Sequence, residues 1–317
     1  MPQGLKTPLL GTIPGDMVRY RKPTERSGDV IDVRGSGGGR RPGLAIGAGG
    51  GGLAIVIAII VALLGGGGGG SGLEDVLDQL QPAPQTPAAE APLDPATDPQ
   101  ADMADFMSVV HDDNNAMWAE IFSQSGRQYD NPQLVLFTGF TDSACGGADA
   151  RMGPHYCPLD NQIYLDMDFF AELSSRFGAT GDLAPAYVLS HEIGHHVQNL
   201  LGINEQVRSL QQQNPAEAND LSVRMELQAD CFAGVWASTV FVGQLETGEN
   251  LALDPGEITE AMEAAAAVGD DRIQMTAQGR VNPESWTHGS SAQRQQWFQA
   301  GYDSGDPNSC DTFSGSL

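Results

Sequence analysis

His191-Glu192-Ile193-Gly194-His195 is the stretch that decides the fold, because it follows the pattern H-E-x-x-H. On an α-helix, residues four apart lie on one face, so His191 and His195 can bind one metal ion together. Glu192 then lies beside the first ligand, where it can take a proton from a metal-bound water, as in zinc proteases. A five-residue motif also arises by chance, so the rest of the sequence is needed to distinguish a metal site from a chance match.

The residues around the motif predict that it lies in a helix. Pro185 stands where a helix can begin, and Gly202 stands where one can end. His196 is turned about 100° from His195 on such a helix, so we expect it near the site or on the surface rather than as a ligand. Apolar residues recur close to the helical period at Val188, Leu189, Ile193, Val197, Leu200 and Leu201.

A catalytic zinc site takes three protein ligands, so two histidines leave it one short. The best candidate is Glu226, on a second predicted helix over residues 225–236, with Asp230 four residues later on the same face. Two acids on a largely apolar helix are costly unless a positive charge lies opposite, and a zinc ion supplies that charge. We expect Glu226 to be the third ligand and Asp230 to accept the free ring N–H of a ligand histidine. The alternative is a solvated acidic face.

The pattern H-E-x-x-H followed by E-x-x-x-D resembles that of the gluzincin metallopeptidases. The run Thr287 to Arg294 is similar to the T-H-P-x-x-x-x-R segment of the membrane-embedded heat-shock and CAAX prenyl protease group. Nearly the whole chain resembles the neutral zinc metallopeptidase family of bacteria, the YpfJ-like proteins. The stretches that carry this resemblance are GPHYCPLDNQIYLDMDFF, HEIGHHVQNLLG, ELQADCFAGVWA, THGSSAQRQQWFQAGYDSGDPNSCDTF and, near the N-terminus, V-I-D-V-R-G.

The resemblance implies a zincin-like fold, one zinc ion held by His191, His195 and Glu226, and Glu192 as the catalytic base. It also implies that His288 stabilises the oxyanion of the tetrahedral intermediate and that Arg294 holds Asp230 or the substrate. The plain alternative for the last two is a capping histidine and a surface arginine. One departure from the family pattern is His155, where an aromatic residue is expected.

Residues 43–64 are 22 residues without a charge, which is long enough for a transmembrane helix. A cleaved signal peptide is the alternative, but the stretch begins late and lacks a clear cleavage site. Residues 1–42 hold 8 of the 16 Lys and Arg and 4 of the 41 acids, so the positive-inside rule places this basic polar segment in the cytoplasm. We therefore expect a single-pass protein of the bacterial cell membrane, with the lipid bilayer as a partner and the catalytic domain outside.

All four cysteines follow that apolar stretch, and an even number in an exported domain indicates two disulfides. Of the three possible pairings, we expect Cys145–Cys157 to close a local loop and Cys231–Cys310 to tie the tail to the Glu226 helix. A cysteine zinc site is disfavoured because the chain has no C-x-x-C pair.

Residues 65–102 are rich in glycine and then in proline, which predicts an extended linker. The remaining residues, 103–317, are enough for one metallopeptidase domain. Its predicted fold class is α+β, mainly helical with a small sheet. The predicted elements besides the two motif helices are helices over 105–122, 261–268 and 292–300, a buried strand over 134–138 and an edge strand over 161–166, the last available to pair with an extended substrate.

Two kinds of function fit these features. The first is a membrane-anchored zinc-dependent endopeptidase acting on peptides or proteins, and a variant of it cleaves amide bonds in cell-wall peptides. The second is a catalytically silent binding or scaffold module that retains a zinc site. Glu192 favours the first, since a structural zinc site needs no base and is usually closed by four ligands. Nucleic acid is excluded as a partner by the 37 acids that face only 8 arginines after residue 42.

Overall fold

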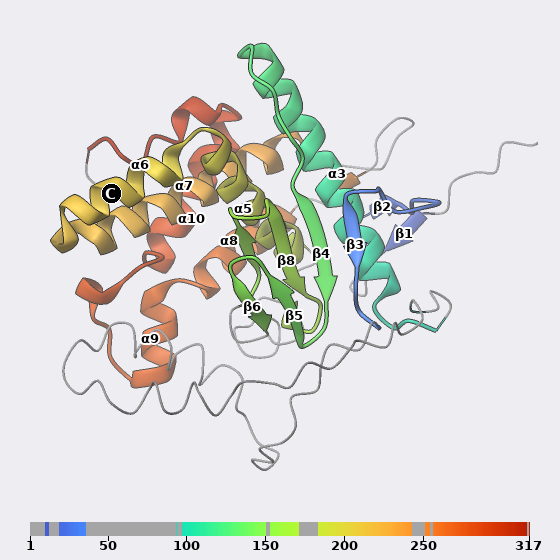
Figure 1. Ribbon diagram of the computed structural model, residues 1–317, viewed down its shortest axis with the longest axis horizontal. Coiled ribbons are helices and arrows are strands. Elements are labelled where there is room, and N and C mark those ends of the chain that lie inside the picture. The colour runs from blue at the N-terminus through green and yellow to red at the C-terminus, as the bar shows by residue number, and fades with distance from the viewer. Residues whose placement is uncertain are drawn as a thin grey trace, which may run out of the picture.

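The computed structural model describes residues 10–12, 19–35, 93, 97–149, 153–170, 183–242, 251–253, 256–315 and 317 (Figure 1). Its α-helices are α3 (Ala101–Gln124), α5 (Leu183–Leu200), α6 (Ile203–Gln213), α7 (Ala218–Thr239), α8 (Glu257–Ala267), α9 (Asp270–Gln278) and α10 (Ser291–Ser304). Short 3-10 turns are η1 (Pro215–Glu217), η2 (Pro283–Ser285) and η3 (Pro307–Ser309). The strands are β1 (Leu10–Thr12), β2 (Arg19–Arg21), β3 (Val30–Asp32), β4 (Gln133–Phe137), β5 (Phe140–Ser143), β6 (Gly146–Asp149), β7 (His155–Cys157), β8 (Gln162–Asp166), β9 (Phe241–Val242) and β10 (Leu251–Leu253).

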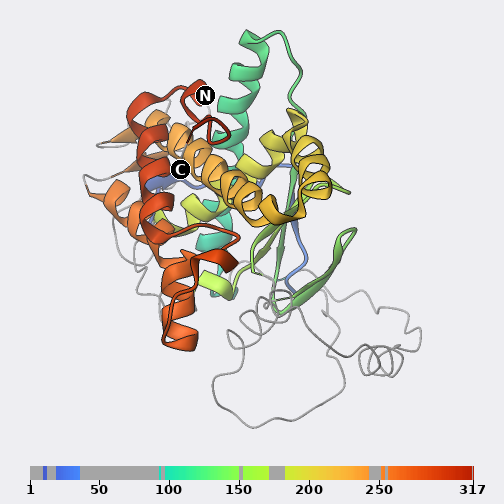
Figure 2. The same ribbon diagram turned by 90° about the vertical axis from the view of Figure 1, so that its left-hand side faces the viewer.

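The sheet nearest the motif helix has the order β3-β4-β8-β7. Its first three strands are parallel, with Leu134 opposite Ile163, and β7 runs antiparallel along the edge. The central strands β4 and β8 are buried along most of their length, as expected of strands covered on both faces. In both views the helices coloured orange to red group on one side of the green strands (Figures 1 and 2). The α+β fold class, mainly helical with small sheets, is confirmed.

The elements expected from hydrophobic periodicity are present, with longer helices than expected. The motif lies in α5, the Glu226 segment lies in α7, and Gly202 stands between α5 and α6 with a left-handed φ of 78°. Helices α3, α8 and α10 and strands β4 and β8 cover the other predicted elements. Helix α6 was not predicted; it is mostly exposed and buries only Val207, and its few apolar residues, Ile203, Val207 and Leu210, recur at the helical spacing among polar ones.

The prediction that residues 161–166 form an edge strand is wrong. This segment, β8, pairs with β4 on one side and with β7 on the other. The alternation of its sequence was misleading, because both faces and both edges of the strand are covered. Among the described residues, no strand pairs with the outer side of β7 or of β3, and of these two edges β7 contacts the motif helix.

The predicted boundary of the domain at residue 103 also differs from the structure, because residues 19–35 are part of the same fold. Strand β3 pairs in parallel with β4, and Tyr20 is fully buried, its hydroxyl donating to the carbonyl oxygen of Asp102 at 2.9 Å. Arg34, 3% exposed, pairs with Asp32 at 2.7 Å and with Asp98 at 2.8 Å. The positive-inside rule placed these residues in a separate cytoplasmic segment. Their short strands carry little hydrophobic signal that could have predicted a place in the sheet.

The proposed transmembrane stretch, residues 43–64, lies outside the described residues, as does most of the linker predicted over 65–102. Of the helices in the described part of the chain, none combines the length and the hydropathy that crossing a bilayer requires. The prediction of a membrane anchor therefore stays a prediction.

Helices α7 and α10 pack with their backbones in close approach (Figure 2). A Cβ atom added at Gly234 would lie 2.0 Å from the carbonyl oxygen of Phe298, and one at Gly301 would lie 2.0 Å from that of Cys231. Only glycine allows the helices to come this near. The Cys231–Cys310 disulfide ties the tail to α7 near the same contact, and Cys145–Cys157 closes the loop before β7, so both expected pairings are confirmed.

Candidate metal centre

The motif helix α5 lies against α7 at a point where neither helix carries a large side chain. A Cβ atom added at Gly194, inside the motif, would lie 3.0 Å from the Cα atom and 3.1 Å from the carbonyl oxygen of Ala229. Small residues at this crossing let the helices approach closely. The approach brings the α5 face that carries His191 and His195 opposite Glu226 of α7.

Three ligand atoms converge at this crossing. The Nε2 atom of His191 lies 3.1 Å from Oε2 of Glu226, and the Nε2 atom of His195 lies 3.6 Å from Oε1. The ligand atoms of the three residues all lie within 4.8 Å of one another. Two imidazoles and one carboxylate are a donor set that suits zinc and leaves a position open for water. The residues present therefore fit the metal that the sequence pattern predicts.

The other ring nitrogen of His191 is fixed by Asp230, as expected from the sequence. Its Nδ1 atom lies 2.8 Å from Oδ1 of Asp230, a carboxylate that is fully buried. Since a carboxylate only accepts, Nδ1 of His191 carries the proton, and Nε2 is the ring nitrogen that would bind a metal ion. Tyr187 also donates its hydroxyl to Oδ1 of Asp230, at 2.6 Å.

Arg294 is buried behind this contact rather than facing a substrate. Its Nε atom donates to Oδ2 of Asp230 at 2.8 Å and its Nη2 atom donates to Oδ1 at 2.9 Å, a two-point ion pair. The side chain is 5% exposed. Of the two contacts expected for Arg294, the structure shows the one with Asp230, so the side chain is placed to hold Asp230 rather than to touch a substrate.

His195 is oriented by a residue that sequence reasoning did not single out. Its Nδ1 atom lies 2.9 Å from Oε1 of Gln198, which is fully buried. The amide nitrogen of Gln198 donates to the carbonyl oxygen of Met225 and to Oε1 of Gln228, which fixes the oxygen toward His195. The available signal was spacing, because a residue three positions after a ligand lies on the same helical face.

The charged groups of the centre shift one another's pKa values. Burial alone lowers the pKa of the His195 imidazole, but the carboxylate of Glu226 outweighs it and raises that pKa to about 9. Burial raises the pKa of the Glu226 carboxyl, yet His195, His288 and His191 hold it well below its ordinary value. A cation binding here therefore meets an ionised carboxylate and displaces histidine protons, so we expect binding to tighten as the pH rises.

Glu192 lies in α5 next to the first ligand and is 7% exposed. Its carboxylate has no hydrogen-bond partner within the described ranges, which leaves it available to a water molecule. His288 is near enough for its charge to act on Glu226, and its side chain is 41% exposed. The structure therefore gathers Glu192 and His288 around the three candidate ligands.

His196 is not part of the group of candidate ligands, and it is buried rather than on the surface. It is 1% exposed, with Nε2 2.7 Å from the carbonyl oxygen of Asp130 and Nδ1 3.1 Å from the hydroxyl of Tyr156. Since Tyr156 belongs to β7, this contact ties the edge strand to the motif helix.

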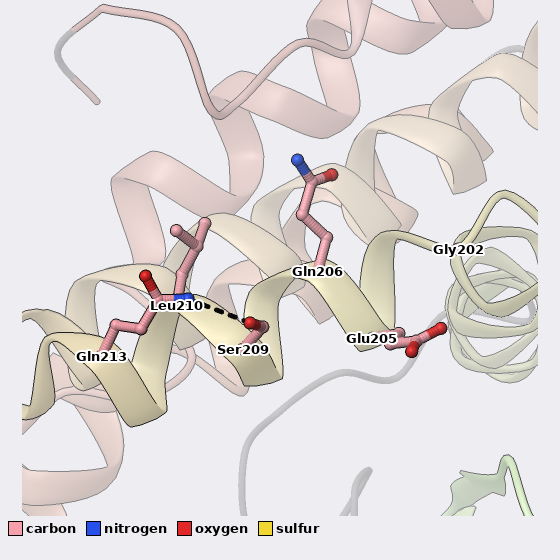
Figure 3. Close-up of a pocket in the computed structure, with 6 residues that line it drawn as sticks. All are labelled: Gly202, Glu205, Gln206, Ser209, Leu210 and Gln213. Carbon is pink, nitrogen blue, oxygen red and sulfur yellow. Dashed lines mark hydrogen bonds between the residues drawn. The ribbon is translucent and has the colours of Figure 1, made fainter.

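A separate hollow lies along α6, and none of the residues of the metal centre lines it (Figure 3). Its lining consists of Gly202, Glu205, Gln206, Ser209, Leu210 and Gln213. These residues lie along one face of α6 and the glycine that precedes it, and all but Gly202 and Leu210 have polar side chains.

The chain is similar to known proteins over most of its length. A family model described as "Putative neutral zinc metallopeptidase" matches residues 18–313. "Uncharacterized protein YpfJ" of Escherichia coli (strain K12) is 49% identical over 216 residues, which cover 68% of this chain and 72% of that protein. "Uncharacterized protein Rv2575" of Mycobacterium tuberculosis (strain ATCC 25618 / H37Rv) is 50% identical over 190 residues, which cover 59% of this chain and 64% of that protein. No solved structure matches the chain significantly.

Proposed function

Because the chain belongs to the neutral zinc metallopeptidase family, we propose that it is a zinc-dependent endopeptidase with Glu192 as the general base. One observation carries the proposal: ligand atoms of His191, His195 and Glu226 lie within 4.8 Å of one another, next to Glu192. A fourth protein ligand is not part of this group in the described chain, which fits a catalytic rather than a structural zinc site.

Each side chain of the centre has a separate role in the proposed reaction. When bound, a zinc ion supplies Lewis-acid polarisation of the attacking water and the scissile carbonyl. Glu192 accepts a proton from the attacking water and passes it to the leaving amine nitrogen. His288 donates a hydrogen bond to the carbonyl oxygen as negative charge grows there. Asp230 keeps the Nδ1 proton on His191, so that the Nε2 lone pair remains free for the metal.

An extended peptide is the proposed substrate, bound along the outer edge of β7. Backbone groups of an edge strand can pair with a peptide in any sequence, which supplies affinity without strong selectivity. The contact of Tyr156 in β7 with His196 in α5 supports this placement, because it holds the edge beside the motif helix. We also propose that the fold of the domain is zincin-like.

The proposal is tested by comparing Glu192→Gln with the unchanged full-length chain in cleavage of a denatured, fluorescently labelled protein. Loss of the base should reduce kcat by about 10²–10⁴-fold. Glu217→Gln, an exposed position on η1, is the matched control and should cleave at the unchanged rate. A chelator should abolish cleavage and added zinc should restore it.

Equal activity of Glu192→Gln, or activity that survives chelation, would refute the mechanism. A chain that binds one zinc ion tightly but cleaves neither denatured protein nor cell-wall peptide would instead be the silent binding module. Cleavage of cell-wall peptide but not of denatured protein would change the proposed substrate class and leave the proposed mechanism unchanged.

We also propose that the catalytic domain lies outside the cytoplasmic membrane, which the two disulfides support. The pairing of β3 with β4 requires residues 19–35 to be on the same side of the membrane as the domain. A cytoplasmic position for these residues and a single span over 43–64 between them and the domain are therefore not carried into the proposal. Alkylating thiols in intact cells before lysis tests export. Both disulfides should be found formed, and four free cysteines would contradict an exported domain.

A further inference from the structure

The loop Thr287–Gly289, which carries His288, is held by a single carboxylate. The Oδ2 atom of Asp270 accepts the backbone N–H groups of Thr287 at 2.7 Å, His288 at 2.6 Å and Gly289 at 3.1 Å. The N–H of Asp270 donates in return to the carbonyl oxygen of Gly289 at 2.9 Å. Asp270 is 4% exposed and is the first residue of α9, so it belongs to a rigid element rather than to the loop.

The far side of the loop rests on the helix that carries the third ligand. Gly289 has a φ of 91°, and a Cβ atom there would lie 3.2 Å from Val223 and 3.3 Å from Leu227 of α7. Leu227 directly follows Glu226. The loop is therefore held between Asp270 of α9 and the part of α7 that contains the candidate ligand.

The same carboxylate faces the ring of His288. Its Oδ1 atom lies 3.3 Å from Nδ1 of His288, and the hydroxyl of Thr287 lies 3.0 Å from that nitrogen. A carboxylate only accepts, so this contact keeps a proton on Nδ1, and in the protonated imidazolium form Nε2 carries the second proton, which it can donate to the site. Within the described ranges, Nε2 of His288 has no hydrogen-bond partner.

We propose that Asp270 is the positioning residue for His288, fixing the loop and the ring so that Nε2 faces the oxygen of the scissile carbonyl. Asp270 touches neither substrate nor ligand and acts through His288 alone. The role rests on the proposed peptidase function, but the contact between Asp270 and His288 can be measured without any activity.

The variant Asp270→Asn tests the proposal, with Asp271→Asn as the matched control. Asp271 is the next residue of the same helical turn and accepts from the N–H and hydroxyl of Ser291, both at 2.8 Å, but it makes no contact with His288. Misplacing a catalytic group costs up to about 10²-fold, so Asp270→Asn should lower kcat between about 10-fold and 10²-fold, with KM within about twofold. Asp271→Asn should keep the kcat of the unchanged chain.

A second variant separates positioning from a general structural loss. If Asp270 acts through His288, Asp270→Asn combined with His288→Ala should have the same kcat as His288→Ala alone. Multiplied losses in the double variant would overturn the proposal, as would a full kcat in Asp270→Asn.

Nuclear magnetic resonance of the histidine ring nitrogens gives a readout independent of cleavage and of folding in the variants. In the unchanged chain, His288 should show a slowly exchanging Nδ1 proton, because Oδ1 of Asp270 lies 3.3 Å from that nitrogen. A freely exchanging Nδ1 proton would overturn the proposal even in a chain with no peptidase activity. If the contact is present and cleavage is absent, the proposed function fails while the orientation of His288 by Asp270 stands.

Discussion

Asp230 offers the sharpest test of how the centre is held together, because one buried carboxylate serves three partners. It accepts from Nε and Nη2 of Arg294 at 2.8 and 2.9 Å, from the hydroxyl of Tyr187 at 2.6 Å and from Nδ1 of His191 at 2.8 Å. The substitution Asp230→Asn keeps the shape of the side chain but removes its charge. The guanidinium of Arg294 then stays buried without a counter-charge.

Removing one partner of a buried ion pair costs about 3–5 kcal/mol in the free energy of unfolding. The matched control is Asp220→Asn on the same helix, where the carboxylate is 56% exposed and pairs with Arg224 four residues later at 2.7 Å. An exposed pair of this kind contributes roughly 0–1 kcal/mol. Loss of the contact to His191 should also weaken zinc binding by about 10–100-fold, whereas the control should bind zinc as the unchanged chain does.

Urea denaturation of the metal-free chain measures the first effect, and competition with a fluorescent chelator measures the second. The double variant Asp230→Asn with Arg294→Gln removes both charges and should recover about 1–3 kcal/mol of the sum of the two single losses. An unfolding free energy of Asp230→Asn within about 1 kcal/mol of the unchanged chain would refute the reasoning, because it would mean that the ion pair contributes no more than a surface pair.

Three further predictions concern stability. Replacing both cysteines of the Cys231–Cys310 bridge by serine should lower the free energy of unfolding by about 4.5 kcal/mol in a denaturant melt, against about 3 kcal/mol for Cys145–Cys157. The difference arises because the bridged cysteines are 79 and 12 residues apart, and the longer loop constrains the unfolded chain more. Equal losses would contradict this loop-entropy reasoning. Burial lowers the pKa of His196 to about 4, so the unfolded chain binds its proton first as the pH falls below 6.5. The unfolding free energy should then decrease by up to about 3 kcal/mol between pH 6.5 and 4, and His196→Gln should show none of this particular decrease. Gly234→Ala should cost at least about 3 kcal/mol by separating α7 from α10, while Gly28→Ala, with no atom near its added Cβ, should cost less than about 1 kcal/mol by the same melt.

Much of the candidate site could be predicted because its chemistry is local or periodic. The ligand pair and Glu192 lie within five residues, so helix geometry alone places them on adjoining positions of one helix. The four-residue spacing of Glu226 and Asp230 carries the same information on the second helix. Gln198 and Asp270 were not predicted, since a glutamine and an aspartate are common on exposed faces and only their contacts mark them out.

The strands were harder to place than the helices. Residues 161–166 alternate as an edge strand does, yet β8 is central because β7, a strand of three residues, covers its other side. Strand β3 pairs with β4 although about a hundred residues separate them. Neither pairing has a periodic signal in the sequence, because a sheet is completed by segments that are distant along the chain.

The sequence by itself determined the metal chemistry: two histidines and a base on one helix, an acid pair on another, and two disulfides. Tertiary structure alone decided how these parts meet. The close crossing at Gly194 and Ala229 brings Glu226 to the histidines, and the fold places Arg294 behind Asp230 and Asp270 behind His288. The physical reason is the separation along the chain over which each interaction acts. Helical spacing acts within one or two turns and can be read from neighbouring residues, whereas the charge and hydrogen bonds that orient each ligand come from elements up to about a hundred residues away.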